Sequence, residues 1–360
     1  MTSIGIMMTV SGVIGSASST VWGSLADRYG RLRPLLFIIF LRGIAFLLLA
    51  WSVWHKSGFI VFAGFYIFSG VLGTGLFPIT DAIVSDVTTR EKRVEVFGIM
   101  RVVMNMSWAL GPAVGGLLVQ GGYHWLFVAT SISLLISGIV AVIRLRETHP
   151  PEKRTGADPA DNNGTNGGFA PYLKDTIFMQ FLAIAVLIFL VKGQLVATIS
   201  VHSAETVGLG KGEISILYFL NGACVAIFQL AISRLVARRN PLLALAFSGI
   251  LYSIGYAVVG FAGGFPTMIT AMLIITSGEL FEAPTTSAYV ANLAPARLSG
   301  TYMGAFNMVL HLGWTIGPLL GGILTDKFAN PTHMWMVISG MALTASFGFL
   351  MLYRKRVADH

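Results

Sequence analysis

The sequence has few charged residues and a single cysteine. Aspartate, glutamate, lysine and arginine make up 11% of its 360 residues, whereas soluble domains carry about a quarter. Cys224 lies in an apolar run, which excludes a disulfide framework. No histidine or cysteine pair has the spacing of metal ligands, so we expect neither a metal nor a cofactor. With 55% hydrophobic residues, this composition indicates a polytopic membrane protein.

Long apolar runs dominate what remains. Runs of about 20 residues can cross a bilayer as helices. The predicted spans are residues 4–22, 34–54, 59–85, 94–119, 124–143, 176–201, 214–236, 241–261, 266–291, 301–324 and 334–353. A polar segment rich in proline, asparagine and glycine separates the first five from the rest. We therefore predict an all-α protein with an N-terminal bundle at 1–145, a linker at 146–175 and a C-terminal bundle at 176–360.

The basic residues indicate how the spans are oriented. The net charge is +8, but these residues are scattered through short loops rather than gathered as in nucleic-acid-binding proteins. Most of the 24 lysines and arginines fall on one side, together with the linker and the C-terminus, which predicts that this side is cytoplasmic. We expect a monomeric, multi-pass protein of the inner (plasma) membrane, in contact with lipid and with no nucleic acid.

The two halves repeat each other. Residues 98–118 align with 304–324, so that Trp108 matches Trp314, and the same offset matches Pro78 with Pro284. Such duplication is typical of secondary transporters built from two pseudo-symmetric bundles around a central site. The span at 176–201 has no counterpart in the first half, so we expect a further helix upstream of the first residue.

A charged loop, Gly-Ser-Leu-Ala-Asp-Arg-Tyr-Gly-Arg-Leu-Arg-Pro at residues 23–34, is predicted to form a tight turn at the membrane surface. Asp27 can pair with a neighbouring arginine or with the N-terminal end of another helix. The loop resembles the signature loop between helices 2 and 3 of the major facilitator superfamily. That resemblance implies twelve spans, of which the first is missing here, and a cytoplasmic gate held by Asp27 and Arg31. The predicted gate residues are Gly23, Asp27, Arg28, Gly30, Arg31, Asp86 and Arg93, with Asp86 bridging to Arg28 or Arg31.

Two glycine-proline motifs lie in corresponding spans. Small residues four apart let helix backbones approach closely, and proline bends a helix. The predicted helix-packing residues are Gly111, Pro112, Gly115, Gly116, Gly313, Gly317, Pro318, Gly321 and Gly322. The pattern resembles that of the drug/proton antiporter branch of the superfamily, which implies multidrug efflux by antiport rather than symport.

Charges within spans are costly and usually functional. Glu279 and Glu282 share a helix face because they lie three residues apart, and we predict that they couple transport to protons. Arg101 or Lys192 is expected to be the counter-charge to Glu279 or to hold an anionic group of the substrate. Asn105 and His311 are further candidate cavity residues, whereas Asp81 is expected to be structural. These residues are marked as sites by nothing more than their position inside apolar runs.

We therefore predict a proton-driven exporter of drugs or other amphipathic small molecules that works by alternating access. A proton-coupled importer or a sugar exporter on the same fold remains an alternative, because fold does not fix substrate. A non-transporting membrane scaffold or sensor is a further alternative. An enzyme is not expected, since no catalytic constellation such as His-Glu-x-x-His lies within the spans.

Overall fold

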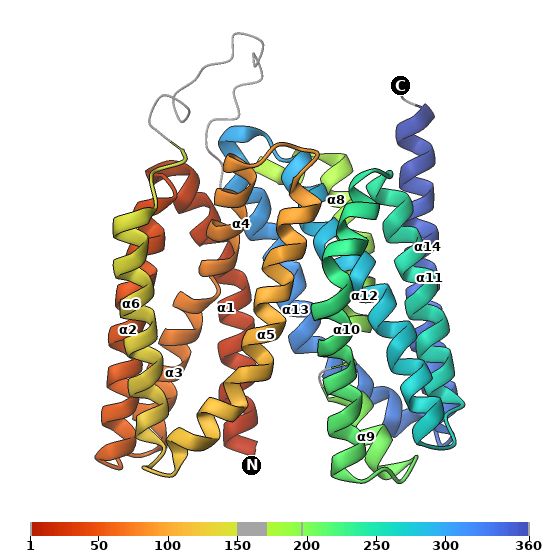
Figure 1. Cartoon of the computed structure of the whole chain (residues 1–360), viewed down its shortest axis with the longest axis horizontal. Helices are drawn as coiled ribbons and strands as arrows, with labels where there is room; N and C mark the ends of the chain where they lie inside the picture. Colours follow the sequence, from red (N-terminus) through yellow and green to blue (C-terminus); the bar gives the residue numbers. More distant parts are fainter. Residues whose placement is uncertain (1, 150–170, 196, 359–360) are drawn as a thin grey trace. The chain divides into compact units, whose positions relative to one another are not determined.

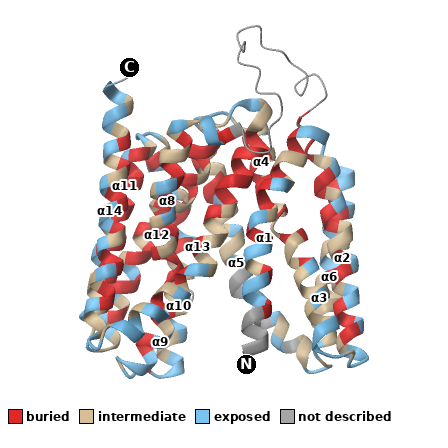
Figure 2. Cartoon of the chain, turned by 180° about the vertical axis from the view of Figure 1, so that it is seen from behind, coloured by how far each residue is buried: buried red, intermediate tan, exposed pale blue. Residues whose placement is uncertain are grey.

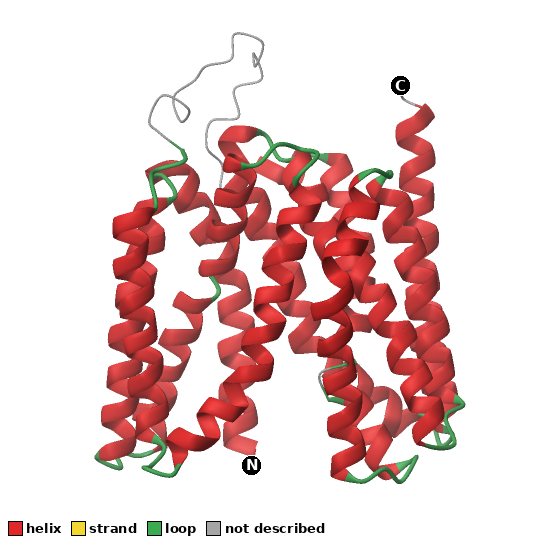
Figure 3. Cartoon of the chain, viewed as in Figure 1, coloured by secondary structure: helices red, strands yellow, loops and turns green. Residues whose placement is uncertain are grey.

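The structure is a computed structural model that describes residues 2–149, 171–195 and 197–358. Most of the predicted linker, residues 150–170, lies outside the described residues. Every regular element in the described part is a helix (Figure 3). The α-helices are α1 (Thr2–Tyr29), α2 (Leu32–Trp54), α3 (Phe59–Gly73), α4 (Leu76–Val87), α5 (Arg93–Val119), α6 (His124–Arg144), α8 (Thr176–Gly193), α9 (Thr198–Glu205), α10 (Lys211–Ala237), α11 (Pro241–Gly260), α12 (Phe265–Leu293), α13 (Ser299–Lys327) and α14 (Pro331–Ala358), with short 3₁₀ turns η1 (Pro171–Lys174) and η2 (Ala296–Leu298).

Each predicted apolar run lies in one helix or in two consecutive helices. Among the described residues, eight of these helices or helix pairs are long and apolar enough to cross a membrane. The predicted spans at 59–85 and 176–201 are each built from two consecutive helices, α3 with α4 and α8 with α9, and each pair is long and apolar enough to cross a membrane as one span. At the first break the Gly75 amide donates to the Leu72 carbonyl, three residues back (3.2 Å). Such tightening of the last turn ends a helix.

The charged loop is shorter than predicted. We expected a turn across residues 23–34, but α1 continues to Tyr29 and α2 begins at Leu32. Only Gly30 and Arg31 connect the two helices, and Gly30 has φ +91°, a conformation that glycine adopts without steric cost. Most of the motif is therefore helical, and side chains four residues apart share a face.

The chain forms two compact units. Unit 1 comprises residues 1–87, 110–175 and 290–308, and unit 2 comprises residues 88–109, 176–289 and 309–360. Each half of the sequence thus contributes one segment to the unit formed mainly by the other half. The bundle boundaries drawn from the linker stay a prediction.

In unit 1, α2 packs beside α6, and α3 packs beside both α1 and α2 (Figure 1). A buried apolar cluster that includes Ala26, Ile38, Leu72 and Ile79 joins α1 through α4. Large apolar side chains on these helices are exposed, Ile60 by 84%, and Figure 2 shows exposed residues along α2, α3 and α6. Because soluble proteins rarely expose extensive apolar surface, these exposed surfaces fit a lipid surround.

In unit 2, α11 packs against α14, and α14 packs against α8 (Figure 1). The approach is close at Gly249, where a Cβ atom would lie 2.7 Å from the Ser346 Cβ. Nearby, the buried rings of Tyr256 and Trp335 stack with centroids 5.8 Å apart. This packing supports α8, which carries the intramembrane residue Lys192.

Candidate functional site

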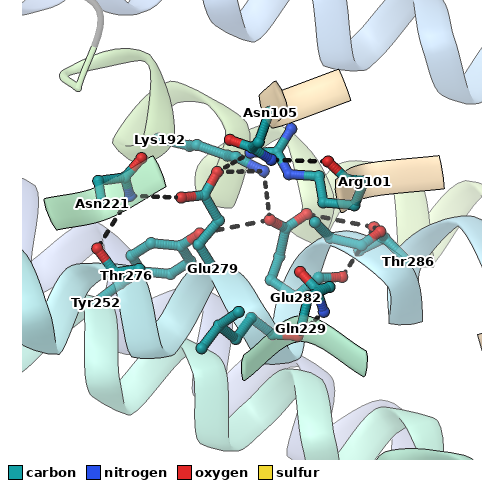
Figure 4. Close-up of polar contacts among 12 residues, drawn as sticks. Arg101, Asn105, Lys192, Asn221, Gln229, Tyr252, Thr276, Glu279, Glu282 and Thr286 are labelled. Atoms are coloured by element: carbon teal, nitrogen blue, oxygen red, sulfur yellow. Dashed lines mark hydrogen bonds and ion pairs between the residues drawn. The ribbon is translucent and has the colours of Figure 1, made fainter. Parts of the chain in front are cut away.

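Four charged side chains from three helices meet within unit 2 (Figure 4). Arg101 of α5 binds the Glu279 Oε1 atom, and the Lys192 Nζ atom of α8 lies 3.9 Å from that oxygen. Lys192 Nζ donates to Glu282 Oε2 at 2.7 Å. We name Arg101, Lys192, Glu279 and Glu282 the charge cluster. Its two positive and two negative charges are equal in number. Such pairing offsets part of the free energy that it costs to take the charges out of water.

The helices explain how these side chains meet. Glu279 and Glu282 lie almost one turn apart on α12 and therefore point to the same side. Lys192 is near the end of α8, where it is 5% exposed, and both glutamates are buried even further. The sequence left open which base is the counter-charge to Glu279. The structure brings both together with the glutamates, with Arg101 on Glu279 and Lys192 mainly on Glu282.

A ring of further polar side chains surrounds the two carboxylates of the charge cluster. Asn221 Nδ2 donates to Glu279 Oε2 (2.9 Å) and to Thr276 Oγ1 (2.9 Å). The Tyr252 hydroxyl lies 3.4 Å from Glu282 Oε2, and the Thr286 hydroxyl donates to Glu282 Oε1 (3.2 Å). Sequence reasoning missed Tyr252, Thr276 and Thr286 because isolated hydroxyls in apolar helices carry no distinctive pattern.

The remaining predicted cavity residues lie outside this hydrogen-bonded ring. Asn105 Nδ2 donates to the backbone carbonyl of Arg101 (2.8 Å), within its own helix (Figure 4). His311 is half-buried on α13, and its backbone carbonyl accepts from the Thr315 hydroxyl (2.9 Å). The buried Arg101 Nε has no hydrogen-bond partner among the described residues.

A second cluster of charges lies in unit 1. Asp27 Oδ1 accepts from Arg31 Nη1 (2.5 Å) and from the Gly300 amide (2.8 Å). Asp27 Oδ2 accepts from the amide (2.6 Å) and the hydroxyl (2.5 Å) of Thr301. Arg31 Nε donates to Asp86 Oδ2 (3.0 Å). We name Asp27, Arg31 and Asp86 the gate cluster. Asp27 thus pairs both with an arginine and with a helix N-terminus, that of α13, as the sequence suggested.

Other predicted gate residues have different roles. A Cβ atom at Gly23 would overlap the Gly300 carbonyl oxygen, so α1 and α13 touch backbone to backbone. Arg28 is exposed and lies over the Tyr29 ring, 5.5 Å from its centroid. The expectation that Asp86 pairs with Arg28 or Arg31 is thereby resolved in favour of Arg31. Arg93, the first residue of α5, is half-buried and belongs to the other unit.

Two residues that follow α6 complete the gate cluster, and sequence reasoning missed both. The Glu147 carboxylate accepts from the amides of Arg31 (2.9 Å) and Leu32 (3.2 Å), and so caps the N-terminus of α2. The Thr148 hydroxyl donates to Asp86 Oδ2 (3.1 Å). They escaped notice because they follow a span at the edge of a polar linker, where acidic and hydroxyl residues are ordinary.

The second glycine-proline motif packs α13 on α8. A Cβ atom at Gly317 would lie 2.7 Å from the Gly193 Cα. Gly313 faces the Phe189 backbone, and Gly321 faces polar side chains beyond Gly193. Pro318 lies inside α13, beside the Gly317 carbonyl that accepts from Gln194 Nε2 (2.7 Å). This hydrogen bond is a further link between α8 and α13.

The first copy of the motif does not pack in this way. Among the described residues, no atom from outside the helix's own backbone lies within 4 Å of a Cβ atom built at Gly111 or Gly116, nor at Gly322 in the second copy. At Gly115 the nearest atom is the Leu126 Cδ2, 3.6 Å away. The Pro112 side chain lies outside the described residues. In the described part of the chain, no other backbone therefore makes the close approach expected at Gly111, Gly115 and Gly116.

Comparisons with known proteins agree on one family. The family model of the Major Facilitator Superfamily matches residues 1–318. A Na(+), Li(+), K(+)/H(+) antiporter of Planococcus maritimus is 26% identical and is matched over 98% of this chain and 88% of its own. The tetracycline resistance protein, class H, of Pasteurella multocida is 24% identical over 89% of this chain and 78% of its own. The crystal structure of the human organic anion transporter MFSD10 (TETRAN) has the same fold, with TM-score 0.79, 19% identity and coverage of 96% of this chain and 83% of that one.

Proposed function

Because this chain belongs to the Major Facilitator Superfamily and is therefore a multi-pass membrane transporter rather than an enzyme, we propose that it exports small amphipathic molecules in exchange for protons. The charge cluster carries this proposal. Intramembrane carboxylates commonly mark proton relays and ion pathways. Here two of them, Glu279 and Glu282, are buried together with two bases on neighbouring helices.

Glu279 is the better proton carrier of the two. It forms the only ion pair of the charge cluster that joins α5 to α12, through Arg101. A proton on Glu279 removes the carboxylate charge and with it the electrostatic part of that link. A cationic or hydrogen-bond-donating group of a substrate binds the ionised carboxylate instead, so a proton and a substrate compete for Glu279. Proton binding and substrate binding thus alternate at one site.

The gate cluster supplies the second requirement of alternating access, a contact that can close one side. Asp27 holds the start of α13 by hydrogen bonds to the Gly300 and Thr301 amides, and Arg31 ties Asp27 to Asp86. The positive-residue bias of the loops supports a cytoplasmic position for this contact. We propose that it forms when the transporter is closed to the cytoplasm and breaks when it opens.

The test is proton movement in everted vesicles that contain this chain. After a pH gradient is established, ethidium, tetracycline and a fluoroquinolone are added in turn, and a pH-sensitive dye reports proton efflux. We expect at least one compound to collapse the gradient, and Glu279→Gln to abolish the response. Glu95→Gln is the matched control, since Glu95 forms an exposed pair with Arg234 outside the charge cluster. Full coupling in Glu279→Gln would refute the role of Glu279.

Exchange of alkali cations for protons is a second candidate. It is favoured by the 26% identity to the Planococcus maritimus antiporter over nearly the whole chain, and by carboxylate oxygens, which hard cations prefer as ligands. The same vesicles distinguish the two candidates. Sodium, lithium or potassium chloride would collapse the gradient in place of the organic compounds, and Glu279→Gln would abolish that response as well.

A further inference from the structure

A further intramembrane carboxylate, Asp81 of α4, has an amide as its polar partner and no base. Asp81 is 8% exposed, and Asn307 Nδ2 of α13 donates to its Oδ2 at 3.0 Å. The same Nδ2 donates to the Met303 carbonyl (2.9 Å), which fixes the orientation of the amide. Among the described residues, no lysine, arginine or histidine forms an ion pair with Asp81. This differs from Glu279, which has two bases nearby.

Charged groups on the surrounding helices of unit 1 are engaged elsewhere. Asp27 and Arg31 bind each other and the start of α13. The Arg42 guanidinium of α2 lies against Gly73 and 5.5 Å from the centroid of the Phe46 ring. The other charged or titratable side chains on α1 to α4 and on this part of α13 are Arg28, Tyr29, Arg33, Tyr66, Asp86 and Tyr302. Burial without a base makes the ionised form of Asp81 costly.

The sequence repeat relates this contact to the charge cluster. The alignment of 98–118 with 304–324 places Arg101 opposite Asn307, and the match of Pro78 with Pro284 places α4 opposite α12. Each unit therefore contains a corresponding pair of helices, α5 with α12 in unit 2 and α13 with α4 in unit 1, although at this offset Asp81 itself matches Ser287 rather than Glu279. In unit 2 the matching position holds Arg101, whose positive charge neutralises Glu279. In unit 1 it holds Asn307, which has no charge and cannot neutralise Asp81.

We propose that Asp81, held by Asn307, is a second proton-binding site of this transporter. A proton supplies the neutralisation that arginine supplies between the corresponding helices of unit 2. The site stands apart from the proposed role of Glu279, because it lies in the other unit and shares no residue with the charge cluster.

The position of Asp81 connects it with the gate cluster. Asp81 and Asp86 lie on the same helix, separated by about 7.5 Å of helical rise. Asn307 and Thr301 are likewise on one helix, separated by about 9 Å. The helices that meet at Asp81 are thus the two that the gate cluster ties at their ends, Asp86 on α4 and Thr301 on α13. A change in charge at Asp81 therefore acts directly on the contact between α4 and α13, which is the contact that must open toward the cytoplasm.

The test counts titrating carboxyl groups rather than transport. The full-length protein is reconstituted in liposomes, and infrared difference spectra are recorded as the pH is cycled without substrate. We expect Asp81→Asn to remove one protonated-carboxyl band that persists in Glu279→Gln. Glu95→Gln serves as the control for a carboxylate outside both sites and should leave that band in place. A spectrum of Asp81→Asn identical to that of the wild type would overturn the proposal.

A second variant keeps the test decisive if Asp81→Asn does not fold. Asn307→Ala retains the carboxyl group but removes its hydrogen-bond donor, so the midpoint of the Asp81 band must move. An unmoved midpoint would overturn the proposal as well. Failure of Glu279→Gln to affect transport would refute the proposed function and leave these spectra unchanged, so the two ideas fail separately.

Discussion

Replacing Asp27 by asparagine should open the gate cluster. The side chain keeps its size but loses its charge, and the new amide nitrogen faces donors where a carboxylate oxygen accepted them. Asp27 accepts four hydrogen bonds, two from backbone amides at the N-terminus of α13, one from the Thr301 hydroxyl and one from Arg31. Asp27→Asn therefore weakens the contact of α1 with α13 while leaving both helices intact.

The magnitude follows from which partners remain. Removing one partner of a buried ion pair costs about 3–5 kcal/mol, because the other charge is left unpaired. Arg31 keeps Asp86 as a partner at 3.0 Å, so the lower end applies. A loss of about 3 kcal/mol shifts the ratio of closed to open contact roughly 100-fold toward the open form. A contact that is closed in nearly all molecules then becomes open in a measurable fraction.

Spin-label distances measure this shift. Labels at the exposed positions Tyr29 and Ala296 report the separation of α1 from the start of α13, in a background where Cys224 is replaced by serine. Asp27→Asn should add a population at longer distance, whereas Arg28→Gln, which changes an exposed charge one residue away, should not. If Asp27→Asn and the parent protein give the same distribution, the gate cluster does not hold this contact and the reasoning is refuted.

Three further substitutions test other contacts. Gly317→Leu should lower the thermal unfolding temperature in detergent, because overpacking against Gly193 costs about 1–3 kcal/mol, whereas Gly111→Leu, with no atom within 4 Å of its Cβ position, should lower it far less. Glu147→Ala should cost about 0.5–2 kcal/mol, as expected of a lost helix cap, and hydrogen exchange at the first amides of α2 should accelerate. Lys192→Met should lower the free energy of unfolding more than Lys192→Arg, because methionine leaves Glu282 without its basic partner. In denaturation experiments, the methionine variant should therefore unfold at a lower denaturant concentration than the arginine variant.

Length and polarity were enough to predict most of the helices and to single out the residues of the charge cluster, whereas the gate residues followed from the resemblance of the charged loop. A long apolar run satisfies its backbone inside a bilayer by forming a helix, and the described residues of the runs in this sequence are helical apart from short breaks. A charge within such a run is exceptional, which is why Glu279 and Lys192 could be singled out. The pairing of Asp27 with a helix N-terminus also followed from elementary electrostatics.

What the sequence left open and what it missed have different physical origins. The choice between Arg28 and Arg31 was left open because the loop was treated as a turn, whereas α1 continues to Tyr29. Arg28 therefore lies on α1 and points about 100° away from Asp27, whereas Arg31 lies just beyond the end of α1 and binds Asp27. The role of Glu147 could not be predicted in the same way. It depends on a three-dimensional approach to α2 that no periodicity records.

The glycine motif of α13 gives the two clusters a physical connection. Lys192 of the charge cluster precedes Gly193, and Gly193 packs against the Gly317 backbone without any intervening side chain. α13 is one continuous helix from Ser299 to Lys327, and its first turn is held by Asp27. Because backbone contacts of this kind cannot be compressed, a shift of α8 that follows a change of charge at Lys192 must move α13 as well. Along this one helix, Gly317 contacts the residue that follows Lys192, and the first turn binds Asp27.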